Sequence, residues 1–119
     1  MNLSNGSSGM IGIGNNTYSV AAAAVNCIAV GLNAASAMQY GTNNIFIGTS
    51  AGSNMATGSC CGFVGQGNKA FTSSDHCEWV IGSEYNSTTQ VITPITGAGA
   101  NTMKLGSILN GTAGKVINI

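Results

Sequence analysis

The chain carries almost no charge. Charged residues make up 5% of its 119 residues, with three lysines, no arginine and a formal net charge of zero. An ordinary soluble domain has about 25% charged residues, and a nucleic-acid-binding domain presents a basic face. The composition therefore argues against nucleic acid as a partner.

Long apolar segments and targeting patterns are also missing. The longest apolar run, residues 20–25, is far shorter than the roughly 20 residues that a membrane-spanning helix needs. The N-terminal segment contains no basic stretch followed by an apolar core, which is the pattern of a secretory signal. We therefore expect no membrane insertion.

The four cysteines do not form any CxxC pair, so the common zinc-binding spacings are absent. With no secretory pattern, we expect free thiols made in a reducing compartment. We predict no metal and no other cofactor. The cysteines are Cys27, Cys60, Cys61 and Cys77.

Small residues are abundant instead. The chain has 18 glycines and one proline, and Asn, Ser and Thr together make up about a third of it. These residue types are poor in helix interiors, whereas a 44% hydrophobic fraction is too high for a disordered chain. The composition predicts a repetitive, all-β fold.

A repeat of fixed length runs through most of the chain. A short cluster of β-branched or aromatic residues ending in glycine recurs at a constant interval of seventeen positions, four times in succession without an insertion. Such a period is typical of a solenoid, in which each repeat is one coil. We predict a parallel β-solenoid, of β-roll or β-helix type, with five 17-residue coils in residues 1–90. The closing glycines are Gly14, Gly31, Gly48, Gly65 and Gly82.

Each repeated strand is apolar at consecutive positions, which is typical of strands buried on both faces. We expect the residues immediately before the closing glycines to face the coil interior, and Phe46 and Phe63 to face outward. An outward apolar column is best covered by further copies of the chain, although the opposite strand of the same coil is an alternative cover. The expected trimer and core packing residues are Ile13, Val30, Phe46, Ile47, Phe63, Val64, Trp79 and Ile81.

The units at residues 41–57 and 58–74 resemble the repeats of viral tail-fibre and spike proteins from phages or large viruses. Residues 28–31, Ile-Ala-Val-Gly, are also similar to the head repeats of bacterial trimeric autotransporter adhesins, whose units are typically shorter than these. The resemblance covers residues 10–87. It implies a homotrimer of parallel β-coils and a structural role in host attachment, and it carries over no binding residue.

This resemblance favours a segment of a virion fibre or spike that recognises a glycan or protein receptor on the host surface. The first alternative is a trimeric adhesin head on a bacterial cell surface. A carbohydrate-acting or ice-binding β-solenoid is the other, but no column keeps the regular threonines that an ice-binding face would need.

Few residues could support catalysis, and we predict that the chain is not an enzyme. Glu78 and Glu84 could in principle form the carboxylate pair of a glycosidase. We expect Glu78 instead to lie on a solvated rim. His76 is the only histidine, and we expect a surface or turn position for it, with a metal held by three copies around a trimer axis as the alternative. The glycine-rich segment 12–17 resembles part of a phosphate loop but lacks its lysine and helix.

Three tyrosines break the plain repeat and are candidates for surface recognition, because aromatic rings among small polar residues suit stacking on sugars or proteins. Packing at coil corners or between chains is their alternative role. They are Tyr18, Tyr40 and Tyr85.

The strict spacing stops after Gly82, and the only proline, Pro94, follows soon after. Proline lacks the N–H that a sheet ladder needs. An open solenoid end also exposes unpaired strand edges, which need a cover. We therefore predict that residues 91–119 form a non-repeat β cap at the tip of the trimer.

Overall fold

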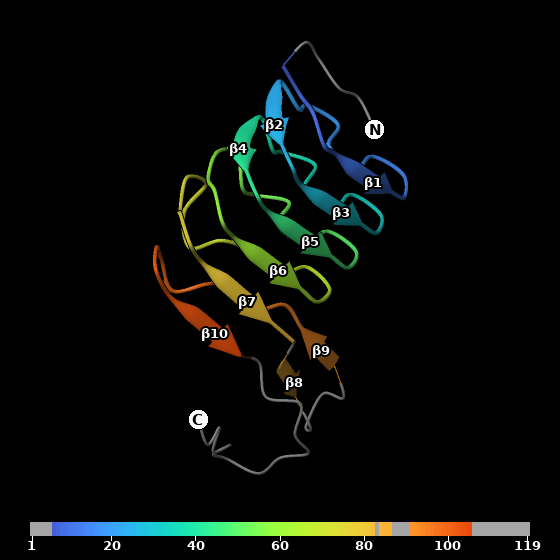
Figure 1. Cartoon of the computed structure of the whole chain (residues 1–119). Helices are drawn as coiled ribbons and strands as arrows, with labels where there is room; N and C mark the ends of the chain where they lie inside the picture. The colour runs from blue at the N-terminus through green and yellow to red at the C-terminus, as the bar shows by residue number, and fades with distance from the viewer. Residues whose placement is uncertain (1–5, 83, 87–90, 106–119) are drawn as a thin grey trace.

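The computed structural model describes residues 6–82, 84–86 and 91–105, and in these it contains only β-strands, turns and bends. All the strands are very short, as expected for coils rich in glycine and asparagine. The all-β parallel solenoid predicted from the repeat is confirmed (Figure 1). The strands are β1 (Ile11–Ile13), β2 (Ala23–Val25), β3 (Ile28–Val30), β4 (Tyr40–Thr42), β5 (Ile45–Ile47), β6 (Gly62–Val64), β7 (Trp79–Ile81), β8 (Glu84–Asn86), β9 (Val91–Thr93) and β10 (Met103–Leu105).

A six-stranded parallel sheet, in the order β1-β3-β5-β6-β7-β10, forms one wall of the solenoid (Figure 1). From β1 to β7 each strand pairs with its equivalent in the next repeat, so that Ile13, Val30 and Ile47 are neighbours in one column. The sequence period is therefore the length of one turn, and equivalent residues of successive turns stack. A second, two-stranded parallel sheet joins β2 to β4.

Glycine closes each strand of the large sheet for a steric reason. Gly31 has φ of 134°, and a Cβ atom there would lie 2.5 Å from the carbonyl oxygen of Gly48 in the next turn. Only glycine can turn the chain this sharply while the backbones of adjacent turns remain so close. The repeated glycines are therefore required by the stacking itself.

The interior is lined by the central residues of β3, β5, β6 and β7. Ala29, Phe46, Phe63 and Val80 are fully buried, whereas Ile13 is 61% exposed. The sides expected from the sequence were therefore wrong: the residues before the closing glycines face outward. Because both columns are apolar, alternation alone could not tell them apart. The structure puts the middle residues of β3, β5, β6 and β7 inside.

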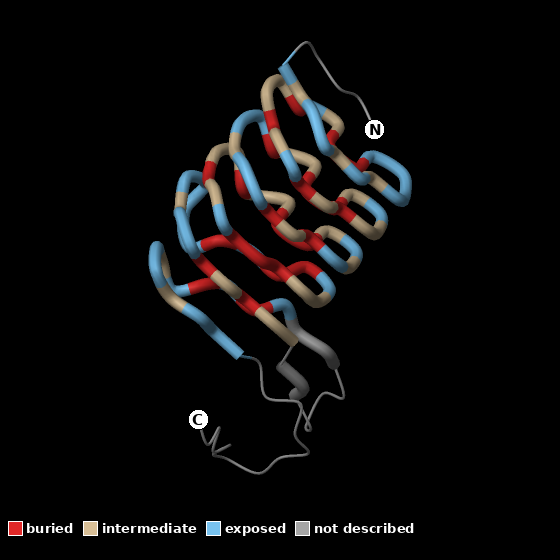
Figure 2. The backbone as a smooth tube through the Cα atoms, in the orientation of Figure 1, coloured by how far each residue is buried: buried red, intermediate tan, exposed pale blue. Residues whose placement is uncertain are grey.

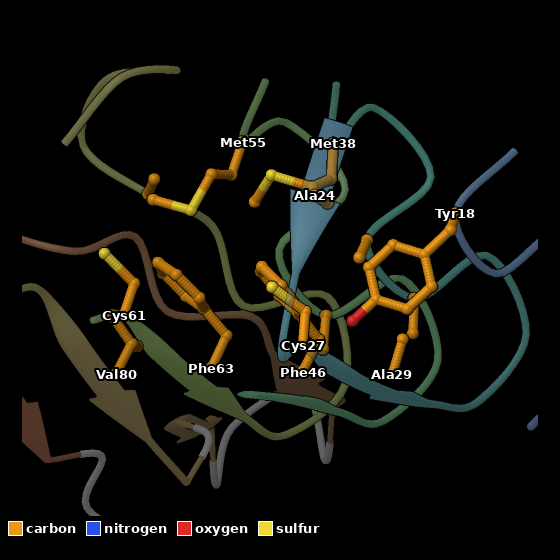
Figure 3. Close-up of a cluster of buried hydrophobic side chains, with 14 of the residues drawn as sticks. Tyr18, Ala24, Cys27, Ala29, Met38, Phe46, Met55, Cys61, Phe63 and Val80 are labelled. Carbon is orange, nitrogen blue, oxygen red and sulfur yellow. The ribbon is translucent and has the colours of Figure 1, made fainter. Parts of the chain in front are cut away.

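The core is a continuous row of side chains along the solenoid axis. The rings of Phe46 and Phe63 are stacked, with centroids 5.8 Å apart and an interplanar angle of 6°. Tyr18 meets Phe46 edge-on at 6.4 Å, and its ring lies beside the small side chain of Ala29 (Figure 3). Met38 and Met55 cover this row from the opposite side of the coils (Figure 3). Figure 2 shows the resulting pattern, in which buried positions recur from turn to turn.

The last turn differs from the others. β10 pairs in parallel with β7, so the sheet continues, but Met103 follows Trp79 by more than the length of one repeat. The additional chain contains the antiparallel pair β8 and β9. The sheet thus extends beyond residue 90, while the predicted division there stays a prediction. Most of the predicted cap, residues 106–119, lies outside the described residues.

Within the described part of the chain, no helix is long and apolar enough to span a membrane.

Candidate functional site

The outer face of the six-stranded sheet is the main candidate site. On either side of each buried central residue, one side chain points outward, so the sheet presents two outward columns. We name this surface the ladder face. All its members are apolar or glycine: Ile11, Ile13, Ile28, Val30, Ile45, Ile47, Gly62, Val64, Trp79, Ile81, Met103 and Leu105.

The ladder face is substantially open to solvent. Ile13 and Met103 are 61% and 62% exposed at its two ends, and Ile47 is 41% exposed near its middle. Between them, Val30 and Ile81 are half-buried, because the side chains of neighbouring strands, which form the rungs of the ladder, cover part of one another. The protein therefore displays a continuous apolar strip along the length of its sheet.

Trp79 belongs to this strip and not to the core. A Cβ atom added to Gly62 would lie 2.3 Å from Cε3 of Trp79, so the indole ring covers the backbone of the preceding turn at Gly62. The absence of a side chain at Gly62 makes room for the largest side chain of the face. Gly62 and Trp79 are thus neighbours in one outward column, on the adjacent strands β6 and β7.

Of the eight residues predicted for trimer or core packing, Phe46 and Phe63 lie in the core. The structure places the other six on the ladder face: Ile13, Val30, Ile47, Val64, Trp79 and Ile81.

A polar row borders the second sheet. The backbone N–H and the hydroxyl of Thr42 donate to Oγ of Ser59, at 3.0 and 3.2 Å. The N–H of Ser59 in turn donates to Nδ1 of His76 at 3.2 Å. His76 is exposed, as predicted, and it ends a row of hydrogen-bonded residues from three successive turns. This edge of the solenoid is hydrophilic, in contrast to the ladder face.

Glu78 is fully buried, so its predicted position on a solvated rim was wrong. Its carboxylate accepts hydrogen bonds from the N–H groups of Gly99 at 2.8 Å and Phe71 at 3.2 Å. The last turn folds over this side chain, an arrangement that repeat spacing alone did not indicate. Both oxygens are occupied by backbone donors, and the side chain of Glu84 lies outside the described part. A pair of Glu78 with Glu84 therefore stays a hypothesis from the sequence.

All four cysteines are free. Cys27 and Cys61 are buried, and burial raises the pKa of both thiols. Cys60 and Cys77 are exposed at equivalent corners of adjacent turns, with φ of 62° and 55°. Among the described residues, no group of three His, Cys, Asp or Glu side chains could hold a metal ion.

The structure describes the side chains of two of the three candidate tyrosines, and these two differ in exposure. Tyr18 is fully buried and packs in the core, so it is not a surface recognition residue. Tyr40 is 51% exposed on β4 and remains a candidate. The side chain of Tyr85 lies outside the described residues. Phe71, another aromatic residue, is 63% exposed.

No protein-family model, curated protein or solved structure matches this chain.

Proposed function

We propose that this chain is a structural segment of a trimeric viral fibre or spike that takes part in attachment to a host surface. The ladder face carries this proposal, because an apolar strip along a whole β-solenoid needs to be covered by protein. In a homotrimer, three such strips meet around the axis and remove one another from water.

The arrangement of the remaining chemistry supports a structural role. Glu78 is engaged by backbone donors, and the accessible thiols and imidazole lie at corners of the coils. The hydrogen bonds among Thr42, Ser59 and His76 join one turn to the next, so these polar residues also serve the stack. This use of polar residues fits a rod-like scaffold on a virion.

Tyr40 is the described residue best suited to contact a receptor. Its half-exposed ring lies on β4, in the same strand as Thr42 and beside the polar row. An aromatic ring bordered by hydroxyl groups suits stacking on a sugar and hydrogen bonding to its edge. We propose a host glycan as the ligand of this edge, with a protein receptor as the alternative.

The proposal is tested by binding of the purified chain to immobilised glycans and to host cells. We expect Tyr40→Ala to abolish binding and Tyr40→Phe, which keeps the ring, to retain most of it. An oligomeric wild-type chain that binds neither glycans nor cells would contradict the attachment role.

A further inference from the structure

The chemistry of the ladder face restricts what can cover it. The face contains no polar side chain and no charge, and even Lys104 of β10 points away from it, with Nζ bonded to the carbonyl oxygen of Thr96. A charged or hydrogen-bonding partner would therefore find nothing to pair with. The matching partner is another flat, uncharged, apolar surface.

The exposure of the face suits a protein contact. Five of its side chains are 39–62% exposed and lie on one continuous sheet: Ile11, Ile13, Ile47, Met103 and Leu105. Contiguous exposed apolar patches mark interaction sites on soluble proteins. The ladder face is thus suited to association with another apolar surface.

A second copy of this chain fits this surface better than an unrelated sheet. The rungs are spaced by the distance between parallel strands, about 4.8 Å. Another copy has the same spacing over the same six strands, so side chains of the two faces can interlock along the full length. We therefore infer that the ladder faces of copies of this chain pack against one another, with solenoid axes parallel and like rungs at the same height.

This inference rests on the proposed function only for the number of copies, which is three. Under threefold symmetry, Trp79 of each copy meets its equivalents at one level. Trp79 is half-buried in the single chain and would become buried in the assembly. Its fluorescence therefore reports on this contact directly.

The test compares lysine substitutions on and off the ladder face of the full chain. Ile47→Lys places a charge in the middle of the face, and Ile13→Lys places one at its end, where folding is least at risk. Leu32→Lys is the matched control, since Leu32 is 47% exposed and lies outside the face. Light scattering gives the mass of each variant, and circular dichroism checks that it is folded.

We expect the wild type to have a mass of three chains of 11.8 kDa. Either ladder substitution should weaken association on the order of 100-fold, because an unpaired charge would be buried in each contact. Leu32→Lys should leave the mass unchanged. Trp79 emission should shift to shorter wavelength as wild-type chains associate, and this shift should be lost in Ile47→Lys.

Two results would overturn the inference: a wild type that stays at 11.8 kDa at micromolar concentrations, or equal weakening by Leu32→Lys and the ladder substitutions. A dimer that Ile47→Lys dissociates would support the contact and contradict the trimer of the proposed function. An intact trimer without host binding would contradict the attachment role alone.

Discussion

The regular turns and the last turn of this solenoid differ in length, in what they bury and in how their backbone groups find hydrogen-bond partners. From β1 to β7, every turn has the length of one sequence repeat, and its interior holds apolar side chains such as Phe46 and Phe63. The last turn takes a longer path to reach β10 and folds over the buried carboxylate of Glu78. The backbone of the regular turns pairs with equivalent neighbours and, at some positions, with an amide side chain such as that of Asn44. In the last turn, the carboxylate of Glu78 accepts from the N–H groups of Phe71 and Gly99.

Asparagine marks the transition between these two regions. In the regular stack, Asn44 donates from Nδ2 to the carbonyl oxygen of Gly58 and accepts from the N–H of Cys61. Asn68 donates similarly to Gly82 and accepts from the N–H of Ile95, which belongs to the last turn. An amide can both donate and accept, whereas the carboxylate of Glu78 only accepts. Amide side chains therefore link one turn to the next by donating and accepting, whereas the carboxylate of Glu78 only accepts and lies where the regular stack ends.

The largest expected effect is in the regular stack. Phe46→Ala removes a ring that contacts both Tyr18 and Phe63, and it leaves a cavity between stacked turns. We expect the free energy of unfolding to fall by about 3–5 kcal/mol. Urea denaturation measures this loss. Leu32→Ala, at an exposed position, is the control and should cost less than about 0.5 kcal/mol.

A substitution in the last turn should lower the free energy of unfolding by less, and its effect should be confined to that turn. Glu78→Ala leaves the N–H groups of Phe71 and Gly99 without their acceptor. We expect a loss of about 1–3 kcal/mol. Amide hydrogen exchange should accelerate at Gly99 and Phe71 but not at the strand residue Phe46. Equal acceleration at all three positions would show that the two regions unfold as one unit.

A substitution at Gly62 tests its contact with Trp79, at the border between the regular turns and the last turn. Gly62→Ala forces the indole ring off the sheet, because its Cβ atom would overlap the ring. We expect about 1–2 kcal/mol of destabilisation and a red shift of Trp79 emission. Val64→Ile, which adds a methyl group on the same strand, is the control. If Gly62→Ala has the same cost in a Trp79→Ala background, the ring is not the cause.

The smallest effect expected near neutral pH is a difference in reactivity among the four thiols. Cys60 and Cys77 should react with a thiol reagent in the native protein, and Cys27 and Cys61 only after unfolding, giving four free thiols in total. A native-state count other than two would contradict the assigned burial.

Those buried thiols also predict the response to alkali. Burial raises the pKa of Cys27 and Cys61 above the ordinary value of 9.0. Above about pH 9 the unfolded chain releases these protons while the folded chain retains them, so unfolding becomes easier. The contribution of these two thiols to stability should be constant below about pH 9 and should then fall as the pH rises toward the raised values. Burial of Tyr18 raises its pKa too and adds to this loss at still higher pH. Cys27→Ala should reduce the slope.

Sequence alone determined the class of fold and the length of each regular turn. The glycines at constant intervals predicted turns of fixed length, and the β-branched clusters before them predicted the strands that stack. This worked because a solenoid repeats the same local geometry, so one column of the sequence corresponds to one column in space. The apolar strip was also predictable, since two adjacent apolar columns cannot both face the same interior.

Only the tertiary structure decided which apolar column is inside, where Tyr18 and Glu78 lie, and how the last turn rejoins the sheet. Phe46 and Ile47 are both apolar, so hydrophobicity alone does not decide which of them is buried. The space inside the narrow coil decides it. Tyr18 fills room left by small neighbours, and Glu78 is buried because distant residues such as Gly99 bring their N–H groups to it. The Glu78 contact depends on a chain segment outside the repeat, and a period carries no information about it.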